Sequence, residues 1–379
     1  MKKRIAVFLM LCMMICGIFG CATSKKNQAT TVEESLDFVV EVEEGREVRV
    51  LQISDTEIID ATQARSAERL NTTQRVMWDP ANMEMKCFNY IQEAIDRVKP
   101  DFIIFTGDLV YGEFDDAGTS LEALIEYMDS CKIPWAPVLG DKDAMGSTAE
   151  TQSKALEKGE YCLFKTGDTD GYGNYSVGIK QGKDFTRIFY MMHSHPNNGL
   201  DDMNKANFTE GQVKWLHDQM KVIDKLTNGA VIKKSVCFHT PTKEFELANE
   251  KYMRKGYEFT INETVKGESG DSGAFQETTS VWSGNNITNA FEAPGYGELS
   301  FLDVLKKYHV DSVFAGHCLG CNTSVSYAGI RWTLGLYTTD YEWPLKPGAV
   351  SITFGDDVTV KYEYFDEEYQ EYIENLDFF

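Results

Sequence analysis

The stretch DFIIFTGD at residues 101–108 joins a short apolar run to a glycine and an aspartate. Its aromatic and β-branched residues are typical of a buried strand, and the glycine is typical of the turn after one. Four other runs have the same form and also end on a side chain that can bind a metal. They are VRVLQIS before Asp55, WAPVLG before Asp141, KSVCF before His239 and DSVFAG before His317. Because side chains beyond the carboxyl ends of strands in an open α/β sheet share one crevice, the five are predicted to meet.

The chain between these runs predicts helices. Apolar residues recur at helical spacing over residues 88–98 and 121–128, with Thr119 or Ser120 as the expected N-cap of the second helix. The resulting β-α-β-α-β order predicts a parallel sheet. Further strands are expected at 175–179, 186–192, 350–354 and 358–364, and further helices at 211–225, 299–308 and 365–376. The Gly- and Ser-rich segment from Gly256 to Gly297 is expected to be a long loop.

Three carboxylates and two imidazoles in one crevice would repel one another or shift in pKa without a cation. The sequence therefore predicts a metal-type site. In this respect the chain resembles the calcineurin-like metallophosphoesterases, including a bacterial branch similar to purple-acid-phosphatase-like proteins. The signature of that family is D-x-H, G-D, G-N-H-D, a lone His and G-H-x-H. The matching positions here are Asp55-Thr56-Glu57, Gly107-Asp108, Gly140-Asp141-Lys142-Asp143, His239 and Gly316-His317.

The resemblance implies an α/β fold of two mixed β-sheets packed face to face with flanking helices. It also implies a cleft in which metal ions clamp a phosphate while a hydroxide attacks phosphorus. Asp108 would bridge the ions; one would take Asp141, His239 and His317, and the other Asp55 and Glu57. Lys142 stands where the family has its catalytic histidine, and Asp143 completes that motif; both are assigned catalytic roles.

Several family residues are replaced. Asp141 stands for Asn, Glu57 for His or Gln, and Leu319 for the second histidine of G-H-x-H. One or two divalent ions are expected per chain. Because Asp55, Glu57 and Asp108 offer only hard oxygens, Mn²⁺, Mg²⁺ or Ca²⁺ is favoured over zinc or iron. Alternatively, Lys142 acts as an internal counter-ion that replaces a metal and leaves a site without turnover.

Nearby residues allow more than one interpretation each. Tyr111 stands where purple acid phosphatases place a tyrosinate ligand, and it also fits as an ordinary loop tyrosine. Cys318 and Cys321 could supply thiolate ligands, form a disulfide or remain buried thiols. His193 and His195 could donate a substitute ligand or form a hydrogen-bonded loop pair.

The N-terminus predicts export. Residues 1–20 combine a basic start with an apolar stretch too short to span a bilayer, and Cys21 follows a sequence that resembles a lipobox. We expect a lipoprotein signal peptide over 1–20, a lipidated Cys21, a flexible tether over 21–45 and a metallophosphoesterase-like domain over 46–379. The alternative is an ordinary secretion signal with an incidental cysteine. The expected location is extracytoplasmic, with membrane attachment only through the lipid.

The composition and the site residues narrow the range of functions to consider. The formal net charge is −22, which disfavours nucleic acid as a partner. The first hypothesis is metal-dependent hydrolysis of phosphate esters, with a phosphorylated small molecule or surface component as substrate. The second is a catalytically impaired phosphatase fold that binds a metal, a phosphorylated ligand or a protein. A solute-binding lipoprotein would not explain five metal-type residues at strand ends.

Overall fold

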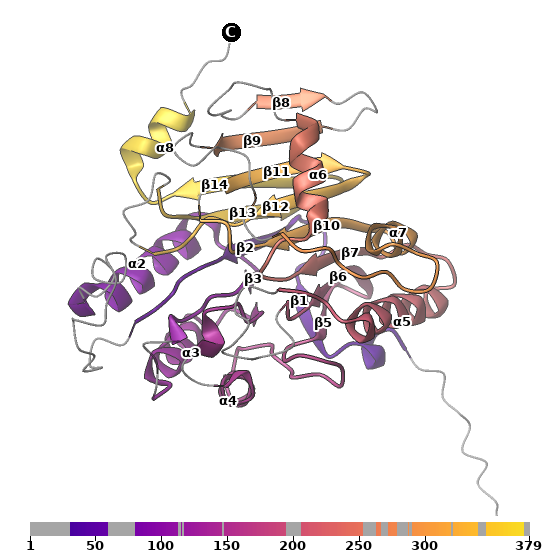
Figure 1. Ribbon diagram of the computed structural model, residues 1–379, viewed down its shortest axis with the longest axis horizontal. Coiled ribbons are helices and arrows are strands. Elements are labelled where there is room, and N and C mark those ends of the chain that lie inside the picture. The colour runs from indigo at the N-terminus through magenta and orange to yellow at the C-terminus, as the bar shows by residue number, and fades with distance from the viewer. Residues whose placement is uncertain are drawn as a thin grey trace, which may run out of the picture. The chain divides into compact units, whose positions relative to one another are not determined.

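The strands form two sheets (Figure 1). The computed structural model describes residues 31–59, 80–112, 115, 117–145, 148–194, 206–252, 263–266, 272–278, 287, 290–319, 321–339 and 346–374. Over these ranges, five strands form one mixed sheet and nine form another. This confirms the predicted α/β fold of two mixed sheets with flanking helices.

The five-stranded sheet has the order β14-β13-β2-β3-β4. Its strands are β2 (Val48–Ile53), β3 (Phe102–Phe105), β4 (Trp135–Pro137), β13 (Gly348–Phe354) and β14 (Val358–Tyr364). β2, β3 and β4 are parallel neighbours, as their alternation with helices predicted. The strands before Asp55, Asp108 and Asp141 therefore end side by side at one edge.

The nine-stranded sheet has the order β1-β5-β6-β7-β10-β12-β11-β9-β8. Its strands are β1 (Phe38–Val42), β5 (Tyr175–Gln181), β6 (Asp184–Met191), β7 (Lys233–Cys237), β8 (Glu263–Lys266), β9 (Ser272–Thr278), β10 (Val310–Ala315), β11 (Cys321–Tyr327) and β12 (Ile330–Leu334). β7 and β10 are parallel neighbours, so the strands before His239 and His317 also end together.

Apolar side chains hold the two sheets together. Phe189 of β6 lies against Phe102 of β3, with ring centroids 5.3 Å apart, and against Phe354 of β13 at 5.7 Å. All three are buried and belong to one continuous core. Burial of this apolar surface is the main force that keeps the sheets face to face, and so brings their strand ends into one site.

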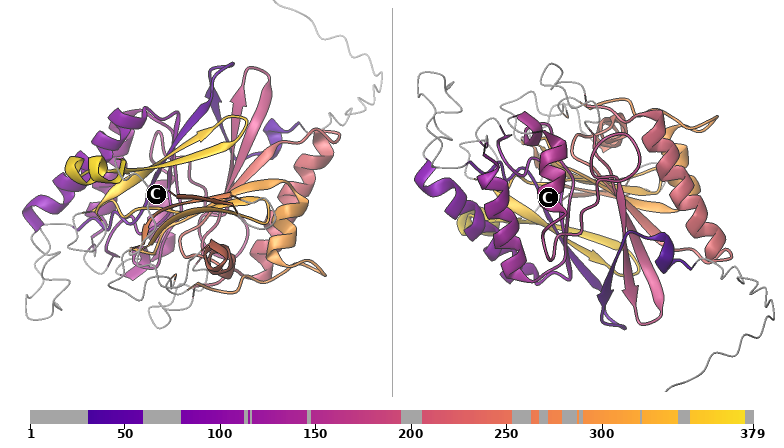
Figure 2. Two further views of the ribbon diagram at one scale, coloured as in Figure 1. Left: turned by 90° about the horizontal axis from the view of Figure 1, so that it is seen from above. Right: turned by 90° about the horizontal axis from the view of Figure 1, so that it is seen from below.

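Helices cover the outer faces of the sheets (Figure 2). α2 (Pro80–Val98) and α3 (Thr119–Cys131) share the core of the five-stranded sheet. α5 (Glu210–Leu226), α6 (Lys243–Tyr252) and α7 (Phe301–Lys307) pack in a second core against the nine-stranded sheet. The remaining helices are η1 (Glu33–Ser35), η4 (Asp143–Met145), α4 (Ala149–Leu156) and α8 (Glu367–Glu374). Over the described residues, no helix combines the length and apolar character that a membrane span requires.

The predicted tether over 21–45 is too long. β1 lies inside that range and pairs with β5 in parallel, from Phe38↔Val177 to Val42↔Gln181. Residues from Thr31 onward belong to the same compact unit as the domain. The polar composition before residue 38 hid this strand, which exists because β5 offers it an edge to pair with.

Two other local predictions were wrong. The N-cap of α3 is Gly118, and the carboxylate of Asp115 accepts hydrogen bonds from the backbone N–H groups of Ser120 and Leu121. The expected loop from Gly256 to Gly297 contains β8 and β9, and β9 pairs antiparallel with β11. The cap depends on a nearby side chain outside the helix, and β9 depends on pairing with a strand more distant in the sequence.

Candidate metal centre

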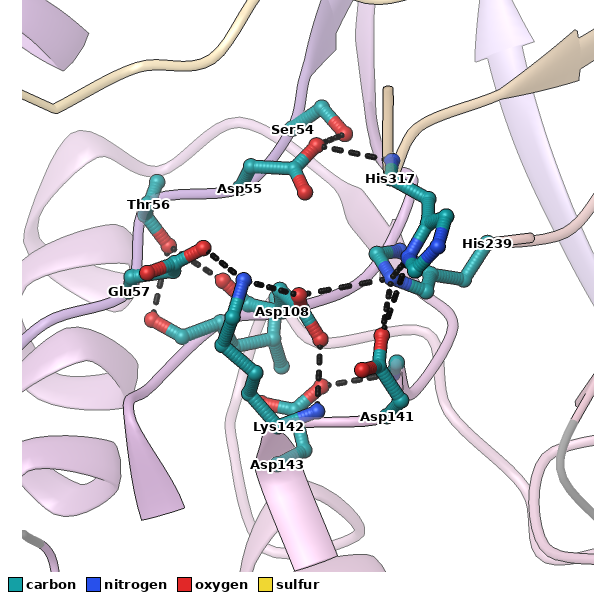
Figure 3. Close-up of polar contacts among 12 residues, drawn as sticks. Ser54, Asp55, Thr56, Glu57, Asp108, Asp141, Lys142, Asp143, His239 and His317 are labelled. Carbon is teal, nitrogen blue, oxygen red and sulfur yellow. Dashed lines mark hydrogen bonds and ion pairs between the residues drawn. The ribbon is translucent and has the colours of Figure 1, made fainter. Parts of the chain in front are cut away.

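The five predicted residues converge between the two sheets (Figure 3). Two groups of side chains lie close enough to hold an ion, because their ligand atoms are all within 4.8 Å of one another. We call Asp108, Asp141, His239 and His317 the histidine half. We call Asp55, Glu57 and Asp108 the carboxylate half. The structure thus brings together all six predicted metal ligands, and Asp108 belongs to both halves.

Unusual backbone conformations present these ligands. Asp55, Glu57, Asp108 and His317 have φ values of 49°, 42°, 52° and 70°, in the left-handed region that residues other than glycine rarely adopt. Such conformations cluster at functional sites, where surrounding contacts enforce them. Here the enforcing bonds include Asp55 N–H to Gly107 O at 3.0 Å and Glu57 N–H to Asp108 O at 2.9 Å.

Glycines next to the ligands let the strand ends approach one another. A Cβ at Gly140 would lie 2.2 Å from Asp108 Oδ1, and one at Gly316 would lie 2.1 Å from Ser54 Oγ. Both distances are shorter than any van der Waals contact, so a larger residue would push the ligand-bearing loops apart. Gly140 and Gly316, which open the Gly140-Asp141-Lys142-Asp143 and Gly316-His317 motifs, are therefore explained by packing around the centre.

The histidine half fits a divalent cation. His239 Nδ1 donates to the carbonyl of Thr106 at 2.8 Å, which leaves Nε2 facing Asp141 Oδ1 at 3.0 Å. His317 Nδ1 lies 3.1 Å from the same carboxylate oxygen and 3.2 Å from His239 Nε2. Two imidazole nitrogens and two carboxylates thus face one point. A hydrogen bond to the far ring nitrogen is the usual way in which proteins orient a metal-binding histidine.

Electrostatics in this half favour positive charge. Burial opposes protonation of His239, but the carboxylates of Asp108 and Asp141 outweigh it and hold its pKa well above the ordinary value. Burial likewise opposes charge on His317, and its hydrogen bond to Asp141 raises the pKa. The positive charge that Asp108 and Asp141 favour can come from a protonated imidazole or from a bound cation. A histidine binds the metal in its neutral form.

The carboxylate half already contains a cation. Lys142 Nζ contacts Glu57 Oε1 directly and lies 3.1 Å from Asp108 Oδ2. Its backbone N–H also donates to Asp108 Oδ1 at 2.9 Å. An ion bound between Glu57 and Asp108 would have to displace this ammonium group. With Lys142 in this position, the carboxylate half does not fit a metal ion.

One ammonium group does not compensate three buried carboxylates. Burial raises the pKa of Glu57, Lys142 lowers it and Asp108 raises it again, to about 8. Asp55 Oδ2 accepts hydrogen bonds from Ser54 Oγ and from the His317 N–H. Asp55 Oδ1 is buried and has no hydrogen-bond partner among the described residues. Burial also raises the pKa of Asp55, so the carboxylate half lowers its negative charge by holding protons.

Asp143 supports the centre through the backbone. Its side chain is fully buried, and its two oxygens accept hydrogen bonds from the N–H groups of Val110 at 3.0 Å and Gly140 at 2.7 Å. These bonds join the loop after β3 to the loop after β4. Burial and the nearby Asp108 carboxylate raise its pKa to about 8. Its observed contacts position Asp108 and Asp141, while its catalytic role stays a prediction.

The other candidates lie around this core. The Tyr111 ring centroid is 5.9 Å from Lys142 Nζ, on the side of the carboxylate half. His193 is buried and its Nδ1 accepts from the Tyr172 N–H at 3.0 Å, while His195 lies outside the described residues. Cys318 is buried beside His317. The side chain of Cys321 is outside the described part, so their pairing stays a prediction.

Sequence reasoning missed two supporting groups. Ser54 orients Asp55, and the carbonyl of Thr106 fixes His239. Both directly precede a motif residue, at the end of a strand or in the turn beyond it. That position was the available signal, but it does not reveal which atoms turn toward the site.

Comparison with known proteins agrees with this geometry. The family model described as calcineurin-like phosphoesterase matches residues 48–319. The match covers most of the chain, which therefore belongs to the calcineurin-like phosphoesterase family, as its motifs predicted.

Individual relatives are distant. Phosphatase DCR2 of Saccharomyces cerevisiae is 29% identical over 175 residues, which is 42% of this chain and 30% of that protein. "Probable inactive purple acid phosphatase 14" of Arabidopsis thaliana is 27% identical over 252 residues, 58% of this chain and 61% of that protein. The chain thus spans less than two thirds of either relative. A dimetal phosphatase structure from Danio rerio aligns with a TM-score of 0.49 at 11% identity, covering 84% of this chain and 96% of that one.

Proposed function

We propose that this chain hydrolyses phosphate esters with a divalent ion held by the histidine half. The observation that carries the proposal is the convergence of Asp108, Asp141, His239 and His317, with ligand atoms within 4.8 Å. A divalent ion bound there would polarise a phosphoryl oxygen and offset the charge that develops at phosphorus. Imidazole and carboxylate ligands together suit Mn²⁺ or Zn²⁺. The predicted preference for Mn²⁺, Mg²⁺ or Ca²⁺ over zinc or iron rested on the carboxylate half.

Lys142 supplies a second positive charge next to the ion position. Its side chain is 23% exposed, so Lys142 lies at the border between the buried carboxylates and solvent. An ammonium donor placed beside the reacting phosphate can bind a phosphate oxygen and stabilise the transition state. This supports the assignment of Lys142 as a catalytic residue that acts through its charge.

A second candidate function is binding of phosphate esters without turnover. The position of Lys142 between Glu57 and Asp108 favours it, since the ammonium lies where the family's other ion would be. The word "inactive" in the name of the Arabidopsis relative is consistent with it. Such a protein would use the same histidine half to bind the ester but would not hydrolyse it.

Export and anchoring complete the proposal. Lys2, Lys3 and Arg4 followed by an apolar stretch ending at Cys21 support a lipoprotein signal and a lipid-anchored, extracytoplasmic protein. The strongly acidic composition supports a phosphorylated small molecule or surface component, not nucleic acid, as substrate. Incorporation of labelled palmitate in the producing cell, and its loss in Cys21→Ser, would test the anchor.

Hydrolysis is tested with p-nitrophenyl phosphate and bis(p-nitrophenyl) phosphate, on chelated protein and on protein supplied with Mn²⁺ or Zn²⁺. We expect ion-dependent release of nitrophenol that is lost in His239→Asn. His309→Asn is the matched control, because His309 is exposed and outside the centre. Ion binding without release of nitrophenol from either ester would reject hydrolysis of such esters and favour the binding function.

A further inference from the structure

The two halves share Asp108 but differ in the source of positive charge. In the carboxylate half, Glu57 and Asp108 are 1% and 0% exposed, and Asp55 is 2% exposed. Three carboxylates this deeply buried must take up protons or have a cation in their midst. The described structure contains one: the Lys142 ammonium, in contact with Glu57 Oε1 and 3.1 Å from Asp108 Oδ2 (Figure 3).

The backbone fixes Lys142 at this position from both sides. Its N–H donates to Asp108 Oδ1 at 2.9 Å. Its carbonyl accepts from the N–H of Gly112 at 3.0 Å and from that of Met145 at 3.2 Å. The start of the side chain is therefore held above the carboxylates, and the ammonium needs no rearrangement of the loop to reach them.

Departure of the ammonium would be unfavourable. If the side chain swung into solvent, Glu57 and Asp108 would lose their contacts with it while remaining buried, and removal of one partner from a buried ion pair is strongly destabilising. If a divalent ion entered this half, it would need Glu57 Oε1 and Asp108 Oδ2, the two oxygens that the ammonium already contacts. The ammonium and an ion therefore exclude each other from this half.

In the histidine half, by contrast, the described residues place no lysine or arginine against Asp141. The ion pairs of Asp141 within the described residues are with His239 at 3.0 Å and His317 at 3.1 Å. Both partners are imidazoles, which bind a metal once they are neutral. An external cation can enter this half without displacing a fixed positive charge.

We infer that Lys142 is a built-in replacement for one of two metal ions, so that the chain binds a single divalent ion, in the histidine half. This inference deepens the proposed function and uses its ion site. It does not depend on turnover. It also implies that the number of ions is controlled by one side chain, because the three carboxylates of the other half are still present.

The test is metal stoichiometry of the full chain, purified in detergent, stripped with chelator and re-equilibrated with excess Mn²⁺. The ratio of manganese to protein is measured by inductively coupled plasma mass spectrometry after desalting. We expect about one ion in the parent chain and about two in Lys142→Ala. Lys154→Ala is the matched control, since it removes an exposed lysine paired with Glu150 and should remain at about one.

Electron paramagnetic resonance adds a second readout. Isolated Mn²⁺ is expected in the parent chain, and a spin-coupled pair in Lys142→Ala. Two ions in the parent chain, none in it, or one ion in a folded Lys142→Ala would each overturn the inference. Should Lys142→Ala fail to fold, the parent stoichiometry and the absence of coupling still decide the matter. One bound ion without ester hydrolysis would refute the proposed function alone.

Discussion

The histidine half and the carboxylate half are built in the same way but differ in the source of their positive charge. Each is formed by side chains just past the ends of parallel strands, and both use Asp108. In the histidine half, His239 Nδ1 donates to a backbone carbonyl, so its Nε2 can bind an external cation once the ring is neutral. In the carboxylate half, Lys142 provides the cation from the chain itself. The fold therefore fixes where positive charge is needed, and single residues decide its source.

This difference separates two properties that a two-ion centre would combine. Residues of the histidine half should control metal affinity. Residues of the carboxylate half should control stability and its dependence on pH. Asp108 should affect both, because its Oδ2 lies 3.1 Å from Lys142 Nζ and 3.4 Å from His239 Nε2.

Asp108→Asn should have the largest effect. The substitution keeps the shape but removes the charge that both halves share, so we expect loss of hydrolysis by at least about 100-fold, together with weaker binding of the ion. The measurement is the rate on p-nitrophenyl phosphate with saturating Mn²⁺. Unchanged activity would show that Asp108 does not bridge the two halves, and would contradict the comparison between them.

Glu57→Gln should change stability without changing the number of ions. The pKa of Glu57 is raised to about 8, so the folded chain holds a proton that the unfolded chain releases near the ordinary value of 4.5. This contribution to stability is present at low pH and is lost as pH rises from about 5 to about 8. The chelated parent should therefore lose roughly 3 to 4 kcal/mol more stability than Glu57→Gln over that range.

Urea unfolding of both chains at several pH values, followed by circular dichroism, measures this difference. Parallel pH curves would show that Glu57 is not the group that holds the proton. A lower manganese ratio in Glu57→Gln would show that the ion binds in the carboxylate half, and would reverse the assignment of the two halves.

Asp141→Asn combined with Lys142→His should have the smallest effect, and in the favourable direction. The pair restores the family's G-N-H-D motif, removes the ammonium from the carboxylate half and supplies an imidazole that can protonate a leaving group. We expect ester hydrolysis to rise about tenfold, at the low end for general acid catalysis because Leu319 still replaces a ligand. The ratio of kcat/KM to that of the parent measures it. No gain would identify Glu57 or Leu319 as the decisive change.

The sequence predicted where the centre lies better than it predicted how the Lys142 side chain is placed within it. Strand-end residues could be assigned because apolar runs and glycine turns are local signals, and parallel strands place their ends together whatever surrounds them. All six predicted ligands meet as expected. Lys142 was open to two interpretations, catalytic residue or counter-ion, because a flexible lysine side chain can point in many directions. Its position depends on Asp108, Gly112 and Met145, which hold its backbone.

The errors in the fold have a similar origin. β1 and β9 depend on edges offered by β5 and β11, and the cap of α3 depends on Asp115 across a turn. None of these partners is adjacent in sequence to the element that it determines. Patterns of hydrophobicity identify strands and helices with two-sided or periodic burial, and the largely polar strands β8 and β9 carry little of that signal.

The most direct measurement is a crystal structure of the chain grown with Mn²⁺, with anomalous differences collected at the manganese edge. Our account predicts one anomalous peak, among Asp108, Asp141, His239 and His317, with Lys142 Nζ between Glu57 and Asp108. A second peak beside Glu57 and Asp55, with Lys142 turned away, would contradict it.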